Sequence, residues 1–272
     1  MYRKGLENTP EMIDIQPIHD IPALKIGNTV VIGDLHIGVE SHLMKKGFHL
    51  QSRTWDMFNT IASIEKVSRL VVLGDVKDSV PGSSKQEYRE IPEFFERLLE
   101  RFDIVDVVRG NHDTNIEEFL PSRVRVGPAS GIVIDNVGLV HGHTWPSRLV
   151  MKTDVLVTAH NHPTVMFCDG IGRTATEPCW VRGKFTGPSD KYEQVPGTFI
   201  IVPAFNRMLG GSPVNVEGQE LLGPLMNSEL VDMKNARLHS LDGIDLGTVS
   251  GLLVKNKRRS FGKKHTDTYP NI

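Results

Sequence analysis

The chain contains few cysteines, no long apolar run and no marked excess of either charge. Cys168 and Cys179 are the only cysteines among 272 residues, and their spacing fits neither a zinc site nor a redox motif, so we expect two reduced thiols. No apolar stretch approaches the ~18 residues needed to cross a bilayer. The N-terminus also lacks the apolar core of a signal peptide. These absences predict a cytoplasmic protein that does not enter a membrane.

The formal net charge of −2 and the pI of about 6.6 exclude a basic protein that coats nucleic acid. A substrate that carries phosphate would have to be attracted locally, by metal ions or by a basic patch. Hydrophobic residues make up 39% of the chain, which is enough for one large α/β domain with a short appendage.

Composition divides the chain into three parts. Residues 1–22 are polar and interrupted by proline, and they are typical of a lead-in segment. Residues 23–254 are expected to form the domain, with alternating strand and helix signals in 23–205 and a small β-hairpin extension in 206–254. Residues 255–272 are basic and poor in apolar side chains, which predicts a disordered tail or, alternatively, a non-specific contact with nucleic acid.

Local patterns predict several elements within the domain. Residues 52–66 show helical spacing with Ser52 as the N-cap, and residues 91–102 predict a second helix with Pro92 in its first turn. Residues 169–196 are rich in glycine, proline and threonine, which favours long loops with short strands. Tight hairpins are expected at Gly27-Asn28, Asp135-Asn136 and Asp242-Gly243.

Side chains that bind metal ions follow five separate strand-forming runs. Because strands of one sheet end side by side, ligands on successive strand-end loops can converge although they lie far apart in the sequence. Any one of these side chains has an ordinary structural explanation, but the whole ordered set, with six of the eleven histidines in it or beside it, indicates a metal site. The candidate ligands are Asp34, His36, Asp75, Asn111, His141, His160 and His162.

Their residue types fit this chemistry. Asp34 and His36 are separated by one residue at a strand end, so their side chains can project to the same side. A carboxylate and an imidazole there suit a divalent transition metal. Asp75 follows a glycine, where the chain can approach a metal closely, and its two oxygens could bridge two ions. Asn111 adds a neutral amide oxygen.

The order of these motifs resembles the calcineurin-like metallophosphoesterase superfamily. Asp-x-His, Gly-Asp-x-x-Asp, Gly-Asn-His-Asp, His and x-His-x-His occur in sequence between Leu24 and Phe205, with Ala159 where the last motif usually has glycine. The resemblance implies an α/β fold, a four-layer α/β/β/α sandwich with two metal ions at the strand ends.

Carried over to this chain, the resemblance also implies roles. His112 would donate a proton to the leaving group, and the carboxylate of Asp78 would hold that histidine protonated and oriented. His143 lies outside the motifs. It could be an ordinary structural histidine, contact the substrate, or support a metal ligand. The implied ligands are Asp34, His36 and His162 for the first ion and Asn111, His141 and His160 for the second, with Asp75 bridging both.

The Asp-Leu-His-Ile-Gly opening and the stretch Ala204 to Arg207 resemble the prokaryotic, especially archaeal, phosphoesterases related to SbcD. That resemblance implies a manganese-type phosphodiesterase of the DNA repair nuclease type, acting on DNA or RNA, although iron, zinc or nickel would also suit the donors. Phe205, Asn206 and Arg207 have two interpretations, as lining of the substrate cleft or as a packed turn.

Three functions stay open at this stage. The first is a nuclease, the second is a phosphodiesterase or phosphatase for small molecules such as nucleotides, and the third is a protein-binding scaffold without catalysis. An intact His112 and a complete ligand set count against the scaffold, which needs neither. The sequence leaves the natural substrate open, and also whether the chain forms a homodimer.

Overall fold

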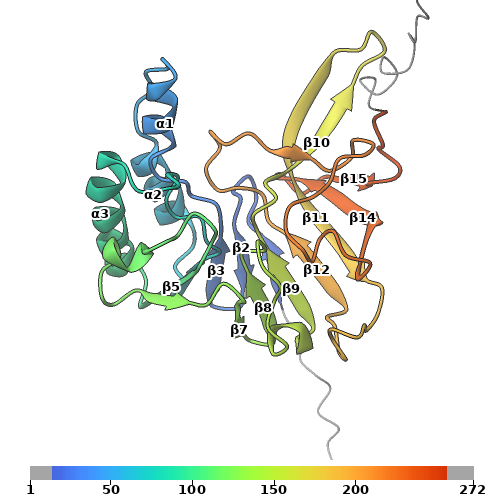
Figure 1. The fold of residues 1–272 in the computed structure, drawn as a ribbon, viewed down its shortest axis with the longest axis horizontal. Helices are drawn as coiled ribbons and strands as arrows, with labels where there is room; N and C mark the ends of the chain where they lie inside the picture. The colour runs from blue at the N-terminus through green and yellow to red at the C-terminus, as the bar shows by residue number, and fades with distance from the viewer. Residues whose placement is uncertain (1–13, 256–272) are drawn as a thin grey trace, which may run out of the picture.

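The computed structural model describes residues 14–255, and it contains two β-sheets packed face to face with α-helices against one of them (Figure 1). The predictions for residues 1–13 and for the basic tail from residue 256 onward lie outside this range. The α-helices of the described range are α1 (Val39–Lys45), α2 (Thr54–Ser63) and α3 (Lys85–Arg101).

The first sheet has the strand order β1-β2-β3-β4-β5-β6. Strands β3 to β6 run parallel, while β1, which lies in the expected lead-in segment, and β2 are antiparallel additions at one edge. Its strands are β1 (Ile15–Pro17), β2 (Leu24–Ile26), β3 (Thr29–Ile32), β4 (Arg69–Val72), β5 (Ile104–Val108) and β6 (Arg125–Gly127).

The second sheet has the order β13-β10-β11-β12-β9-β8-β7, with β14 beside β11 and β15 beside β14. Strands β8, β9 and β12 run parallel to one another. Its strands are β7 (Ile132–Ile134), β8 (Val137–Val140), β9 (Val155–Thr158), β10 (Pro163–Cys168), β11 (Thr174–Phe185), β12 (Thr198–Ile201), β13 (Ser212–Pro213), β14 (Val231–Ser240) and β15 (Asp245–Thr248).

Apolar side chains fill both faces of the first sheet. Val31 and Val71 point toward the second sheet, where they meet Val157 and Ile200, while Val30 and Val72 pack under the helices. Strands buried on both faces have nearly continuous apolar sequences, which is why β3, β4 and β5 were recognisable.

The α/β class and the two-sheet sandwich are confirmed. The outer face of the second sheet is covered differently from the expected helical layer, at least within residues 14–255. There the 3-10 turn η2 (Val150–Lys152) and loop side chains such as Tyr192, Leu225 and Met226 provide the cover.

All three expected hairpins are present, as β2–β3, β7–β8 and β14–β15. Both predicted helices need correction. Helix α2 begins at Thr54 with Arg53 as its N-cap, so Ser52 lies one residue before the cap. The hydroxyl of Ser52 donates to Glu90 and accepts from the backbone N–H of Thr54 at 3.3 Å. Helix α3 begins at Lys85, where Ser84 and Glu87 form a capping box, so Pro92 lies in the helix interior and not in the first turn.

A further difference concerns residues 169–196. Residues 174–185 form the long strand β11, which pairs with β10 through its first half and with β12 and β14 through its second half. Both cysteines are free, Cys168 exposed and Cys179 buried. No helix in the described part of the chain is long and apolar enough to cross a membrane.

Candidate metal centre

The expected ligands all follow the carboxyl ends of parallel strands. Three of the loops that carry ligands belong to the first sheet and follow β3, β4 and β5. The other two belong to the second sheet and follow β8 and β9. Hydrogen bonds join the two sets, because the backbone N–H of His160 donates to the carboxylate of Asp34 at 3.2 Å. The face-to-face packing of the sheets therefore brings ligands from both sheets to one place.

Glycines let these loops approach closely. A Cβ on Gly110 would lie 2.2 Å from Oδ1 of Asp75, and a Cβ on Gly74 would lie 2.7 Å from the backbone of Gly110. Gly74 also has a φ of +73°, which favours glycine. A larger residue at either position would push the β4 and β5 loops apart.

A first donor cluster consists of Asp34, His36 and His162, whose ligand atoms lie within 4.8 Å of one another. Nε2 of His162 is 3.3 Å from Oδ1 of Asp34. Nε2 of His36 is buried and makes no hydrogen bond among the described residues. That orphaned nitrogen lies 3.4 Å from Oδ2 of Asp75.

A second donor cluster consists of Asn111, His141 and His160. Nε2 of His141 lies 3.1 Å from Oδ1 of Asn111 and 3.1 Å from Nδ1 of His160. The same nitrogen is 3.4 Å from Oδ2 of Asp75. One oxygen of Asp75 therefore lies between the two clusters, at equal distances from His36 and His141.

These spacings fit two divalent ions. Donor atoms about 2.1 Å from one ion lie about 3.0–3.4 Å from one another at octahedral or tetrahedral angles. Carboxylate, amide and imidazole donors in one set suit first-row transition metals. The residues present would hold one ion in each cluster, with Asp75 as the shared ligand.

Neighbouring groups orient the two central imidazoles. Nδ1 of His141 donates to the carbonyl of Leu73 at 2.7 Å, and Nδ1 of His36 lies 3.2 Å from Oδ1 of Asp78. Both contacts direct Nε2 of the ring toward the centre, as in other metal sites whose ligands are supported by outer hydrogen bonds.

The backbone at the centre is strained. Five of the seven expected ligands have a positive φ between 40° and 68°, a region that residues other than glycine rarely occupy. Such conformations persist only where the surrounding structure imposes them, and they concentrate at functional sites. The strained residues are Asp34, His36, Asp75, His160 and His162.

Buried charges of opposite sign balance one another among the side chains of the candidate centre. Burial alone would lower the pKa of His36, but the adjacent carboxylates of Asp75 and Asp78 raise it to about 10. Burial likewise opposes the proton on His141, yet Asp75 and Asp34 raise its pKa to about 9. Burial and the neighbouring His141 instead lower the pKa of His160 to about 4. The protonated rings of His36 and His141 thus supply the positive charge that bound metal ions would supply instead.

Metal affinity should therefore rise steeply with pH. Each ion must displace one proton, from His36 or from His141, so we expect each apparent affinity to rise about tenfold per pH unit from pH 6 to about pH 9. The raised pKa of each histidine stabilises the metal-free fold below pH 6.5, and this contribution is lost as the pH rises through 9–10. Titrations of manganese in buffers of different ionisation enthalpy would count the protons released.

A matched control is His239→Gln, which removes a histidine outside the centre and should leave the pH slope unchanged. A metal affinity that does not vary between pH 6 and pH 8 would contradict the assigned protonation of both imidazoles.

The contact expected between Asp78 and His112 takes a different form. Nδ1 of His112 donates to the backbone carbonyl of Asp78 at 2.6 Å, whereas the carboxylate of Asp78 faces His36 and, at 3.6 Å, Nδ1 of His42. The ring of His112 lies beside the centre, with a nitrogen within 4.8 Å of the donor atoms of His36 and Asp75. Asp78 thus orients His112 through its main chain.

Asp113, the last residue of the Gly-Asn-His-Asp motif, was not among the predicted site residues. Its buried carboxylate accepts from the backbone N–H groups of Val76 and Gly110, both at 2.8 Å, and so ties the β4 and β5 loops together. Burial and nearby Asp75 raise the pKa of Asp113. Its position as the fourth motif residue was the only available signal.

Of the remaining candidate residues, some are buried in the fold and others are exposed to solvent. Phe205 and Asn206 are buried, and their backbone N–H groups donate to the carbonyls of Gly33 and Asp34, which supports the packed-turn interpretation. Arg207 is exposed. His143 lies near the second cluster, with its ring 5.2 Å from that of His141, and burial lowers its pKa.

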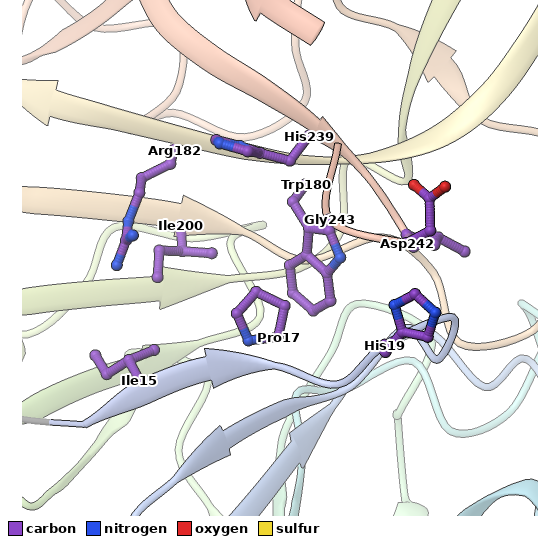
Figure 2. Close-up of a pocket in the computed structure, with 10 residues that line it drawn as sticks. Ile15, Pro17, His19, Trp180, Arg182, Ile200, His239, Asp242 and Gly243 are labelled. Atoms are coloured by element: carbon purple, nitrogen blue, oxygen red, sulfur yellow. The ribbon is translucent and has the colours of Figure 1, made fainter. Parts of the chain in front are cut away.

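A separate cavity of about 360 Å³ lies between β1 and strands β11, β12 and β14 (Figure 2). Trp180, Ile200 and Pro17 form its apolar wall, and His19 and Arg182 are among its polar groups. None of the expected metal ligands lines this cavity, so it contributes no group to the candidate centre.

Comparison with known proteins establishes the family. A model of the calcineurin-like phosphoesterase family matches residues 27–189, which is more than half of the chain. The chain belongs to this family, whose members depend on divalent metal ions, and it is a hydrolase of phosphoester bonds.

Two solved structures are similar to this chain to different degrees. The nuclease MPE of Pseudomonas putida has a TM-score of 0.51 and 17% identity, over 83% of this chain and 95% of that one. Yfce, a phosphoesterase from E. coli, has a TM-score of 0.35 and 18% identity, over 80% and 96% of the two chains. At 17% identity, the likeness to MPE shows the fold alone. No curated protein sequence gives a significant match.

Proposed function

We propose that the chain is a two-metal phosphodiesterase that hydrolyses nucleic acid. The observation that carries this proposal is the placement of Oδ2 of Asp75, 3.4 Å from Nε2 of His36 and 3.4 Å from Nε2 of His141. One carboxylate oxygen between two donor clusters is the arrangement that a paired-ion centre requires. When bound, two such ions would clamp a phosphate and lower the pKa of a water molecule that attacks phosphorus.

The chain's own residues would complete the reaction. Asp34, Asp75 and the imidazoles around them would hold both ions, and the strained backbone would keep these donor atoms preorganised. His112 would donate a proton from Nε2 to the leaving oxygen, since its Nδ1–H is occupied by the carbonyl of Asp78. That proton transfer matters most for a poor leaving group such as the alkoxide of a nucleotide.

Two considerations favour nucleic acid over a small substrate. The strand-end motifs resemble the SbcD-related phosphoesterases, and the structurally similar MPE of Pseudomonas putida is itself a nuclease. We propose manganese as the ion, because the SbcD-related resemblance implies a manganese-type phosphodiesterase and the mixed set of carboxylate, amide and imidazole donors is compatible with it. Cytoplasmic location and a homodimer stay predictions.

The test compares three substrates in the presence of manganese: bis-p-nitrophenyl phosphate, p-nitrophenyl phosphate and single-stranded DNA. We expect cleavage of the diester and of DNA, slow hydrolysis of the monoester, and loss of all three activities in EDTA with recovery on adding manganese. Rapid diester cleavage without any cleavage of DNA or RNA would favour a small-molecule phosphodiesterase. Inactivity on every substrate with metal bound would favour a scaffold.

A further inference from the structure

Residues 42–53, which we call the basic arm, run from the second half of α1 to the residue before α2. The arm contains Lys45, Lys46 and Arg53, together with two histidines, and no aspartate or glutamate. Its two ends are held together, because the backbone N–H of Arg53 donates to the buried carboxylate of Glu40 at 2.8 Å. In a chain with a net charge of −2, this arm is a local concentration of positive charge.

The arm also exposes apolar side chains. Every residue from 44 to 51 is exposed, and Phe48 is 60% exposed. Among the described residues, no aromatic ring stacks on Phe48, and no carboxylate forms an ion pair with Lys45 or Lys46. Arg53, by contrast, is paired with Asp56. A free aromatic ring among unpaired lysines suits a ligand that offers both flat rings and phosphates.

The arm adjoins the metal centre. Helix α1 begins three residues after His36, and Figure 1 shows α1 projecting beyond the sheets on the same side as the β10–β11 hairpin. Nδ1 of His42 lies 3.6 Å from Oδ2 of Asp78, which itself contacts His36. A ligand lying along the arm would therefore reach the candidate centre without leaving the protein surface.

A groove extends the same path. A recess of about 440 Å³ is lined by residues 49–53 and Met208, and it shares Arg53, Asp56 and Met208 with a second recess of about 520 Å³. The second recess is lined by Asp20 and Arg207, among others, and Asn206 in its wall donates to the carbonyl of Asp34. Asp20 is the one carboxylate there in addition to the paired Asp56.

We propose that the basic arm binds a single strand of nucleic acid and guides it into the metal centre, with a base stacked on Phe48 and phosphates near Lys45 and Lys46. This inference rests on the proposed function and names its substrate class. A duplex hides the faces of its bases, whereas a single strand presents them, and proteins that bind single strands combine such aromatic platforms with basic grooves.

The experiment compares two arm variants with wild type on single-stranded and duplex oligonucleotides with manganese. Phe48→Ala should raise KM for the single strand about tenfold. Lys45→Ala/Lys46→Ala should reduce the slope of log affinity against log salt by about 1.4, since each phosphate contact with a single strand contributes about 0.7. Both variants should retain wild-type kcat and KM on bis-p-nitrophenyl phosphate.

Two control variants sharpen the comparison. Lys66→Ala/Lys152→Ala removes two exposed charges near the amino ends of β4 and β9, opposite the metal centre, and should change neither KM nor the salt slope. Phe48→Trp should restore binding, and its fluorescence should be quenched when a single strand binds.

The outcomes separate the two proposals. The proposal that the basic arm binds a single strand would be overturned if the arm variants bound and cleaved single strands as wild type does. Preferential binding of the arm to vesicles of phosphatidylserine would overturn it as well. If wild type cleaves only the small diester, the nuclease proposal fails. Quenching of the fluorescence of the Phe48→Trp variant by a single strand would then still support binding of a single strand at the arm. Absence of quenching would reject it.

Discussion

Replacement of Asp75 by asparagine should lower kcat on a phosphodiester by about 10²–10⁴-fold and release at least one of two bound metal ions. The size of this effect follows from the shared position of Oδ2, 3.4 Å from ligand nitrogens of both clusters. Oδ1 already accepts from the backbone N–H of His112 at 2.9 Å. An amide whose oxygen kept that hydrogen bond would turn its NH2 group toward the ions, and that group has no lone pair to offer.

The pKa of Asp75 leads to the same expectation. Burial alone would raise it, but His141 and His36 hold it far below its usual range, which favours the anion. Its charge is what makes two cations at one site tolerable in a buried setting. Loss of that single charge should therefore weaken both ions together.

Metal content by elemental analysis, alongside kcat on bis-p-nitrophenyl phosphate, would measure the effect. The matched control is Asp106→Asn, which changes another buried aspartate in the first sheet, one that pairs with Arg69 and Arg125 away from the centre. That variant should lose stability but retain two ions and wild-type turnover. Full occupancy and activity in the Asp75→Asn variant would refute the bridging assignment.

Much of this site could be predicted because each ligand can be recognised from the few residues that precede it in the sequence. Each ligand follows a short apolar strand, and parallel strands of one sheet necessarily present their carboxyl ends at one edge. The order of the motifs therefore predicts convergence without any knowledge of distances. The start of α3 is also encoded locally, in the capping box of Ser84 and Glu87, although the predicted helix began only at Ile91.

Other features could not be predicted because they depend on orientation. Asp78 was assigned to His112 from its position in the motif, yet a side chain and a carbonyl on one residue can face different neighbours. The positive φ of Asp34, His36 and Asp75 could not be located in advance, because aspartate and histidine adopt that region more often than most residues but still only in a minority of cases. Strand β11 was hidden by its polar residues, because residues 174–177 are exposed.

The corrected contact of Asp78 leads to the second large effect. His112→Ala should lower kcat on single-stranded DNA by about 10²–10⁴-fold while two ions remain bound. Hydrolysis of a p-nitrophenyl ester should fall far less, because p-nitrophenolate leaves without a proton. The measurement is the dependence of log kcat on the leaving-group pKa, which should become steeper in the variant.

Asp78→Asn separates the two roles that the sequence had joined. Its backbone carbonyl stays in place, so the hydrogen bond from Nδ1 of His112 should survive and the leaving-group dependence should match wild type. The carboxylate that contacts Nδ1 of His36 is lost, so metal affinity should fall about 10–100-fold. If Asp78→Asn instead reproduced the steep leaving-group dependence of His112→Ala with metal affinity unchanged, the carboxylate would be acting on His112 and the main-chain assignment would be wrong.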